Sequence, residues 1–219
     1  MMSSVVVFGA TGLIGTELLA RLKAHNEVTS VAAYGRRAPK LQDATISFVK
    51  GTYDSLDDDL ASWSPKAVFI ALGTTIKKAG SQAAFRDVDF RMVVDAATWA
   101  QRSGVPTLAL VSSVGADPAS PFFYPRVKGE AEQALEALGF SRLVIARPGL
   151  LLGERDELRL GESVATPMMK LAAPILFGPL QKYRPISGKD VADAMVIEAL
   201  GADIEAGTRV LEGASLFRS

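Results

Sequence analysis

Residues 5–19 read VVVFGATGLIGTELL: an apolar run, three glycines at three-residue spacing, and the start of an amphipathic helix. Gly9, Gly12 and Gly15 lie in the connection. Glycine allows a sharp turn, lets a pyrophosphate approach the free N–H groups at a helix N-terminus, and lets the helix pack closely on the strand. The spacing is one residue looser than GxGxxG, but the strand before it and the helix after it are the context in which such a turn binds a dinucleotide. We favour dinucleotide binding over a bare structural turn.

The alternation of strand and helix continues along the chain. Apolar runs at residues 66–72 (KAVFIAL), 107–113 (TLALVSS) and 142–147 (RLVIAR) are separated by longer segments of helical period. Strands that are apolar throughout are typical of a parallel sheet covered by helices on both faces. We predict an α/β fold, a Rossmann-type doubly wound parallel sheet with ligands at the carboxyl ends of its strands.

This rhythm breaks after about residue 150. A charged loop and a proline-interrupted apolar stretch follow, and then a helix opened by Ser187 with Asp190 three residues later. At 219 residues the chain has room for one sizeable core. We expect a single NAD(P)-binding domain over residues 1–219, in which residues 150–219 contribute a small C-terminal lobe on the substrate side.

Composition excludes several classes of function. The 24 basic residues balance the 24 acidic ones, so no net field attracts nucleic acid or anionic lipid. With no cysteine and only one histidine, His25, which we expect to be a solvated surface residue, we predict no disulfide and no metal site. The longest apolar stretch, residues 168–180, is shorter than the roughly 18 residues of a membrane span. We expect a cytoplasmic protein without signal peptide or membrane span.

The residues that follow a predicted strand at 27–35 (EVTSVAAYG) bear on cofactor choice. About twenty residues after the glycine turn, where an NAD-selective site would carry an acidic side chain, the sequence is AAYGRR. Arg36 and Arg37 cannot accept a hydrogen bond from a ribose hydroxyl, but a guanidinium can bind a 2′-phosphate. We therefore predict NADP(H), with two solvated loop arginines as the alternative.

The stretch FFYPRVKGEAE, residues 122–132, places Tyr124 four positions before Lys128. At that spacing the two side chains share a helix face, about 6 Å apart at Cβ. Pro125 must lie in the first helical turn, so Tyr124 stands at the helix start. Ser112 and Ser113 end a predicted strand on the same rim as the glycine turn. A phenol beside an ammonium can act as a general acid, and a serine hydroxyl can orient a carbonyl, although a Tyr-x-x-x-Lys pair by itself is more often a surface pair.

These features together resemble the short-chain dehydrogenase/reductase superfamily, in its atypical, extended-like branch. The motifs GRR, LGTTIKKAGS, SSVGADPASPFFYPRVKGEAE and RPGLLLGERDELRLGE are similar to those of the Tat-interacting protein (oxidoreductase HTATIP-like) family. The resemblance spans residues 9 to about 162, and its block from the serines to the tyrosine and lysine is specific. It implies a Rossmann-fold oxidoreductase.

The resemblance also implies roles for the matching residues. Tyr124 would be the acid/base, Lys128 would bind the nicotinamide ribose, and Ser112 or Ser113 would polarise the substrate carbonyl. The other cofactor-binding positions that it implies are Gly9, Thr11, Gly12, Leu13, Ile14, Gly15, Arg36, Arg37, Leu72, Gly73, Thr74, Pro148 and Gly149.

The chain also departs from the superfamily. After a predicted strand at 45–49 (TISFV), KGTYDS places Thr52 and Tyr53 before Asp54, which argues against adenine recognition through Asp54. The lobe after residue 150 is shorter than in nucleotide-sugar epimerases, which weakens an epimerase interpretation.

Three further stretches have both a structural and a functional interpretation. The charged residues 154–162 favour a solvated loop over a substrate gate. The apolar residues within 168–177 favour the core of the lobe over a membrane helix, and a role in lining a hydrophobic substrate pocket or a dimer face stays open. Three consecutive acids, Asp57 to Asp59, favour a solvated helix start over a metal site, because consecutive residues do not converge.

Two functions stay open at this point. The first is an NADP(H)-dependent oxidoreductase that transfers a hydride to or from a small carbonyl or alcohol substrate with Ser112 or Ser113, Tyr124 and Lys128. The second is an NADPH-binding regulatory or sensor protein that binds a protein partner without significant turnover. We prefer the enzyme, because a sensor needs only the glycine turn and the arginines. A homodimer or another protein partner is compatible with both.

Overall fold

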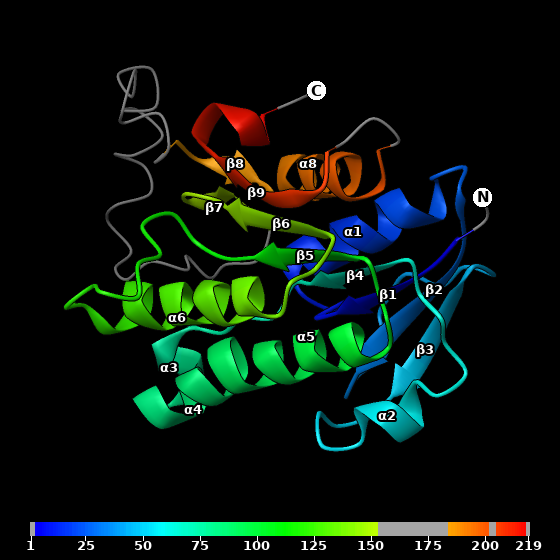
Figure 1. Ribbon diagram of the computed structural model, residues 1–219, viewed down its shortest axis with the longest axis horizontal. Coiled ribbons are helices and arrows are strands. Elements are labelled where there is room, and N and C mark those ends of the chain that lie inside the picture. The colour runs from blue at the N-terminus through cyan, green and yellow to red at the C-terminus, as the bar shows by residue number, and fades with distance from the viewer. Residues whose placement is uncertain (1–2, 153–183, 202–204, 218–219) are drawn as a thin grey trace.

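The computed structural model describes residues 3–152, 184–201 and 205–217. Its main feature is a seven-stranded sheet in the order β3–β2–β1–β4–β5–β6–β9, and every neighbouring pair is parallel (Figure 1). The strands are β1 Ser3–Phe8, β2 Val28–Gly35, β3 Ile46–Lys50, β4 Ala67–Ile70, β5 Thr107–Val111, β6 Arg142–Arg147 and β9 Gly207–Glu212. The chain reverses direction across the sheet beside β1, where ligands bind in open α/β sheets.

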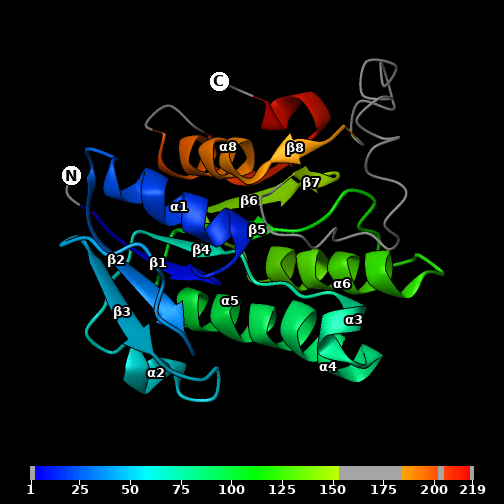
Figure 2. The same ribbon diagram turned by 180° about the vertical axis from the view of Figure 1, so that it is seen from behind.

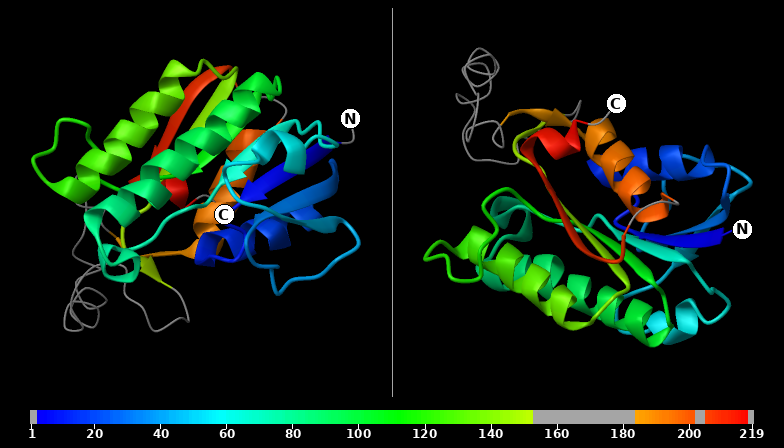
Figure 3. Two further views of the ribbon diagram at one scale, coloured as in Figure 1. Left: turned by 90° about the horizontal axis from the view of Figure 1, so that it is seen from below. Right: turned by 45° about the horizontal axis from the view of Figure 1, so that its top comes forward.

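Helices cover both faces of the sheet. Figure 2 and the two views of Figure 3 show α1 (Leu13–Lys23) and α8 (Gly188–Leu200) on one face, and α5 (Met92–Arg102) and α6 (Phe123–Ala137) on the other. The short helix α2 (Leu56–Asp59) follows β3 on the α5 side. The predicted α/β fold with a doubly wound parallel sheet is confirmed.

The central strand shows why its sequence is apolar throughout. Val5 and Val7 belong to the core under α1 and α8, whereas Val6 and Phe8 belong to the core under α5. Successive side chains of a strand point to opposite faces, so a strand covered on both sides needs apolar residues at every position. All four residues are fully buried.

A broken helical stretch connects β4 to α5. It consists of α3 (Ile76–Ala79), α4 (Gln82–Arg86) and the π-helical segment η1 (Asp87–Arg91), which continues directly into α5. Thr75 and Ser81 cap α3 and α4, each accepting a backbone N–H at 3.1 Å. Gly80 separates the two helices in a left-handed conformation, with φ of 81°.

The described C-terminal elements complete the sheet and its cover. β7 (Leu151–Leu152) pairs with β8 (Ile186–Ser187), α8 packs along α1, and β9 forms an edge of the main sheet before the 3₁₀ turn η4 (Gly213–Leu216). The start of α8 is capped by the Ser187 hydroxyl, which accepts the Asp190 N–H at 3.1 Å. The charged run 154–162 and the apolar residues 168–177 lie outside the described residues, so the substrate-side lobe stays a prediction.

Within the described ranges, none of the helices has the length and apolar character needed to cross a bilayer. In the same ranges, no three His, Cys, Asp or Glu side chains are grouped so that they could hold a metal ion. Two of the consecutive acids in α2 have separate partners: Asp57 pairs with Arg102 at 2.7 Å, and Asp59 accepts the Tyr34 hydroxyl at 2.7 Å.

Candidate functional site

The glycine turn after β1 is built from close backbone approaches. Gly9 has φ of +80°, and a Cβ there would lie 2.4 Å from the Ala71 carbonyl oxygen. A Cβ on Gly15 would lie 2.1 Å from the Gly9 carbonyl oxygen. At Gly12 the nearest atom would be 3.3 Å away. Gly9 and Gly15 are therefore required by the fold, whereas Gly12 leaves space on its outer side.

That space lies at the start of α1. Gly12 is the N-cap residue and offers no side chain to the N–H groups of the first turn, which also lacks an acidic residue. Uncapped N–H groups at a helix N-terminus form a ready site for a phosphate. Thr11 and Leu13 are partly exposed beside this turn, but the Ile14 side chain is buried in the core. Ile14 can therefore contribute only its backbone to the cofactor site predicted for it.

The predicted 2′-phosphate residues follow β2. Arg36 and Arg37 are both exposed, and neither makes a hydrogen bond or ion pair with another residue in the described ranges. Burial raises the pKa of the neighbouring Tyr53, and the positive charge of Arg36 opposes that rise. Two guanidiniums without partners at the carboxyl end of β2 are available to an anion.

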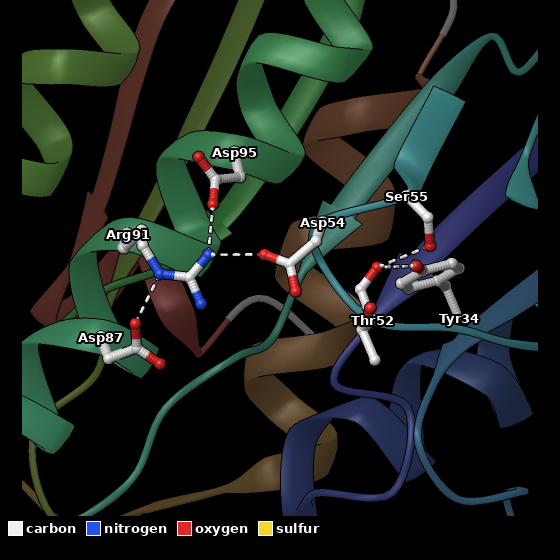
Figure 4. Close-up of polar contacts among 7 residues, drawn as sticks. All are labelled: Tyr34, Thr52, Asp54, Ser55, Asp87, Arg91 and Asp95. Atoms are coloured by element: carbon white, nitrogen blue, oxygen red, sulfur yellow. Dashed lines mark hydrogen bonds and ion pairs between the residues drawn. The ribbon is translucent and has the colours of Figure 1, made fainter. Parts of the chain in front are cut away.

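The loop between β3 and α2 is held from two sides (Figure 4). On the inner side, the Tyr34 hydroxyl donates to the Thr52 carbonyl at 2.5 Å and also contacts Asp59. The pKa of Tyr34 is raised, first by burial of its hydroxyl and then by the neighbouring Asp59 carboxylate. On the outer side, Arg91 lies 3.6 Å from Asp54, which is 80% exposed. Asp54 thus faces a cation from η1.

The two predicted serines differ in their surroundings. The Ser112 N–H donates to the Ala146 carbonyl at 2.7 Å, so Ser112 continues the line of β5. Its hydroxyl is buried and has no hydrogen-bond partner among the described residues. Ser113 is less buried, and its hydroxyl makes only a long contact, 3.4 Å, to the Val114 carbonyl. In β5, Leu108 and Leu110 belong to the core on the α5 side, so alternation directs Ser112 to the same side.

Tyr124 and Lys128 lie at the start of α6 and share one face. The helix begins at Phe123, which places Pro125 in the first turn as predicted. The Tyr124 ring is 5.6 Å from the Phe85 ring, and Lys128 Nζ is 2.7 Å from Asp89 Oδ1. Phe85 and Asp89 are themselves four residues apart along α4 and η1. The tyrosine and the lysine therefore face the same neighbouring helical stretch.

Asp89 is a site residue that the sequence analysis missed. Its side chain is 1% exposed and that of Lys128 is 7% exposed, so their ion pair is almost completely removed from water. The second carboxylate oxygen of Asp89 accepts the Thr74 N–H at 2.8 Å. A Cβ on Gly73 would lie 3.3 Å from Asp89 and 3.8 Å from Lys128 Nζ. Asp89 thus joins Lys128 to the turn after β4, where Leu72, Gly73 and Thr74 were predicted to border the cofactor.

A signal for Asp89 was present in the sequence. Phe85, Asp89 and Val93 recur every four residues, which places the acid on the buried face of a helix. A buried carboxylate requires a cationic or hydrogen-bonding partner. The π-helical geometry of η1 gives no comparable signal in the sequence, although such segments occur frequently at functional sites.

A second ion pair supports the turn after β6. Glu132 lies one helical turn beyond Lys128, and its carboxylate accepts the Arg147 Nε–H at 3.0 Å together with a bond from the other arm of the guanidinium. The Glu132 hydrogen bond raises the pKa of Arg147. Arg147 leads into Pro148, whose carbonyl accepts the Val114 N–H at 3.0 Å. The predicted Pro148–Gly149 turn is therefore tied to the segment that follows the serines.

The family model described as NAD(P)H-binding matches residues 9–200. The chain belongs to the NAD(P)H-binding family. A relative in this group, protein FMP52, mitochondrial, from Meyerozyma guilliermondii, is 38% identical over 199 residues, which cover 89% of this chain and 84% of the relative. The protein of the same name from Emericella nidulans is 39% identical over 171 residues, covering 75% of this chain and 73% of the relative.

Solved structures show the same fold at low sequence identity. The Bordetella bronchiseptica enzyme WbmG in complex with NAD has a TM-score of 0.71 and 16% identity, over 97% of this chain and 73% of that chain. A short chain dehydrogenase family protein from Francisella tularensis has a TM-score of 0.70 and 15% identity, over all of both chains. These likenesses establish the short-chain-dehydrogenase-like fold of this NAD(P)H-binding protein.

Two expectations need revision in light of these relatives. The expected cytoplasmic location is wrong, because the fungal relatives are named mitochondrial proteins. Absence of cysteine fits a reducing compartment but does not separate the cytosol from other such compartments. The relatives also carry the name FMP52 and not that of the Tat-interacting protein, so the wider NAD(P)H-binding family is what the comparison establishes.

Proposed function

We propose that this protein is an NADP(H)-dependent oxidoreductase that acts on a small carbonyl or alcohol substrate. One observation carries the proposal: the buried Ser112 hydroxyl has no partner in the described ranges, and strand alternation directs it to the side of the sheet where Tyr124 and Lys128 share a helix face. An unpartnered buried hydroxyl is unfavourable unless a ligand or an ordered water completes its hydrogen bonds. A substrate carbonyl oxygen would do so.

The residues present fit a nicotinamide dinucleotide. Gly12 leaves room for the pyrophosphate at the uncapped start of α1, and the turns after β4 and β6 lie on the same edge of the sheet. When bound, the cofactor supplies or accepts the hydride. The chain supplies the rest: Tyr124 gives its phenolic proton to the carbonyl oxygen in reduction or receives it in oxidation, and Ser112 orients that oxygen by a hydrogen bond.

We assign the orienting role to Ser112 and not to Ser113. Both end the same predicted strand, and the choice rests on burial and direction: Ser112 is buried toward the α5 and α6 side, where Tyr124 and Lys128 lie. Ser113 lies two residues beyond the end of β5, is less buried, and makes only a long contact with the Val114 carbonyl. Lys128 would bind the nicotinamide ribose, and Asp89 is its positioning residue because the buried carboxylate holds the ammonium beside Gly73.

NADP(H) is the finer part of the cofactor proposal. Arg36 and Arg37 stand exposed after β2 without a partner in the described ranges, and the chain carries no acidic side chain there. A 2′-phosphate would find two guanidiniums available to bind it, whereas an unmodified ribose hydroxyl would find no acidic side chain in the residues directly after β2. We also propose a mitochondrial location, on the strength of the names of the fungal relatives.

A cofactor-binding sensor without turnover is the second candidate. The Asp89–Lys128 ion pair favours a sensor, because the lysine has a structural partner and its burial can be explained without a chemical role. Such a sensor would bind NADPH through the glycine turn and the arginines, and it would contact a protein partner.

The deciding experiment measures NADPH oxidation by the purified protein against aldehydes, ketones and quinones, with cofactor affinity measured in parallel by calorimetry. We expect NADPH binding together with turnover of at least one carbonyl class, and loss of that turnover in Tyr124→Phe. Binding without any turnover across the panel would favour the sensor.

A further inference from the structure

Phe122 is the most exposed large apolar side chain in the described ranges. It is 73% exposed, whereas the other exposed large apolar residues there lie between 38% and 48%. Single exposed apolar side chains are common on protein surfaces and need no special explanation. Phe122 differs from such side chains in the loop that carries it and in its position in the chain close to Tyr124.

The loop that carries Phe122 is fixed by its own hydrogen bonds. The Ser120 N–H donates to the Asp117 carbonyl at 3.0 Å, and the Ser120 hydroxyl accepts the Phe122 N–H at 3.2 Å. The Arg126 guanidinium donates to the carbonyls of Ser120 and Pro121, each at 3.1 Å. A backbone held in this way fixes the direction of the Phe122 Cα–Cβ bond, and the side chain leaves the loop toward solvent.

The loop is also seated on α6. The Asp117 N–H donates to the Pro125 carbonyl at 3.1 Å, and a Cβ on Gly129 would lie 2.2 Å from the Pro118 nitrogen. Glycine at position 129 is what lets the loop approach the helix so closely. The loop and the first turns of α6 therefore form one rigid unit.

This unit places Phe122 beside the proposed chemistry. Only Phe123 stands between Phe122 and Tyr124 in the chain, so the two Cα atoms are within about 7 Å of each other. Of the neighbouring pair of phenylalanines, Phe123 faces inward against Phe85, with ring centroids 5.6 Å apart, and Phe122 faces outward. Ile76, which is also exposed, follows the turn after β4 that borders Lys128. Apolar side chains thus occur on both sequence segments that flank the tyrosine and the lysine.

We propose that Phe122 is a specificity-determining residue that contacts the apolar part of the substrate, and that this substrate is an aldehyde or ketone bearing an aryl or alkyl group of about the size of a phenyl ring. The proposal rests on the proposed function, because it takes the Tyr124 hydroxyl as the centre of the reaction. Small-molecule sites combine a few orienting polar groups with apolar walls. An exposed aromatic ring gains free energy when a ligand removes it from water, and the loop backbone that carries Phe122 is already ordered.

The test compares two aldehydes with the same reacting group, acetaldehyde and 3-phenylpropanal, at saturating NADPH. Phe122→Ala should lower kcat/KM for 3-phenylpropanal at least about tenfold and change that for acetaldehyde less than about twofold. Phe48→Ala is the matched control, since it removes an exposed phenylalanine from β3. It should change neither value. Equal effects of Phe122→Ala on both aldehydes, or an effect no larger than that of Phe48→Ala, would overturn the proposal.

A binding measurement separates this proposal from the proposed function. Calorimetry with 3-phenylpropan-1-ol and the complex of the protein with NADP⁺ requires no turnover, and Phe122→Ala should weaken that binding at least about tenfold. Binding of this alcohol without turnover of either aldehyde would reject the oxidoreductase and leave the apolar specificity of Phe122 standing. No binding by the native protein would overturn the specificity. A change of mass in Phe122→Ala by light scattering would also overturn it, because the ring would then be a contact between copies of the chain.

Discussion

The glycine turn and the centre formed by Ser112, Tyr124 and Lys128 lie on the same edge of the sheet, but they are built in opposite ways. The turn works through missing side chains: Gly12 leaves space, and the uncapped N–H groups of α1 are exposed to it. The centre works through side chains that are placed by others, chiefly the buried Asp89–Lys128 pair.

The two sites also differ in how far apart in the sequence their residues lie. The turn is local, since one strand, three glycines and one helix specify it within residues 5–19. The centre draws on β5, α6, η1 and the turn after β4, which are distant in sequence. Substitution of Gly12 should therefore act chiefly on cofactor binding, whereas Gly9 and Gly15 are also required by the fold. In the centre, substitution of a residue that reacts with the substrate should lower the reaction rate. Substitution of a residue that positions another side chain should lower the stability of the fold as well.

Gly12→Val should give the largest effect on the turn. The side chain would occupy the space left for the pyrophosphate, so NADPH affinity should fall at least about 100-fold, or about 2.7 kcal/mol, as measured by calorimetry. The melting temperature should fall less than in Gly9→Ala, because Gly12 has an ordinary extended backbone and a Cβ there would approach only the Gly9 carbonyl oxygen closely, at 3.3 Å. Gly9→Ala is the contrast: its positive φ and its 2.4 Å approach to Ala71 should destabilise the fold itself. Native affinity in Gly12→Val would show that the turn is only structural.

Tyr124→Phe should give the largest effect on the centre. The variant loses one hydroxyl but keeps the ring contact with Phe85, so folding and NADPH affinity should persist. Turnover on a verified substrate should fall by roughly 10² to 10⁴, the range for a lost general acid. Steady-state kinetics checks the rate and calorimetry checks the binding. A variant that retains full turnover would remove Tyr124 from the mechanism.

Asp89→Asn should act on stability as well as on function. The amide can still accept the Thr74 N–H, but it leaves the buried Lys128 ammonium without its counter-charge, which should lower the free energy of unfolding by about 3 kcal/mol and also weaken cofactor binding. Asp87→Asn, two residues earlier in η1, removes a carboxylate from a solvent-exposed pair with Arg91 and should cost less than about 1 kcal/mol. Denaturant unfolding of both variants measures the contrast, and equal losses would show that burial of the Asp89 pair carries no special weight.

The double substitution Arg36→Ala and Arg37→Ala should give the smallest effect. In the native protein NADPH should bind at least about tenfold more tightly than NADH, equivalent to about 1.4 kcal/mol, and the variant should lose that preference while keeping its affinity for NADH. Calorimetry with both cofactors measures it. Equal affinities in the native protein would refute the assignment of the arginines to a 2′-phosphate.

Much of the fold was predictable because its determinants are local. A strand covered on both faces must be apolar at every position, and β1 is so from Val5 to Phe8. The start of α6 at Phe123 followed from Pro125, which cannot lie deeper in a helix. The seventh strand, β9, was not identified, because its residues 207–210 are exposed at the edge of the sheet and lack the apolar run of the other strands.

The candidate site was predictable in its residues but not in its partners. The spacing of Tyr124 and Lys128 placed them on one face, and the structure shows them against the stretch from Phe85 to Asp89. Which element lies opposite a helix face depends on tertiary packing, so the pairing of Lys128 with Asp89 could not be read from spacing alone. The unequal burial of Ser112 and Ser113 likewise depends on the direction of β5 in the folded sheet.

The π-helical segment η1 has a consequence for the length of this part of the chain. Each residue turns an α-helix by about 100°, and a π turn contains one residue more than an α turn. Removing a single residue between Asp87 and Arg91 would let α4 and α5 merge into one regular helix with both ends still amphipathic. If the residue removed precedes position 89, the carboxylate would be rotated by about 100° about the helix axis, away from Lys128. Substitutions in this helix should therefore be tolerated more readily than a one-residue deletion before Asp89. Such a deletion would preserve the helix but move the Asp89 carboxylate away from Lys128.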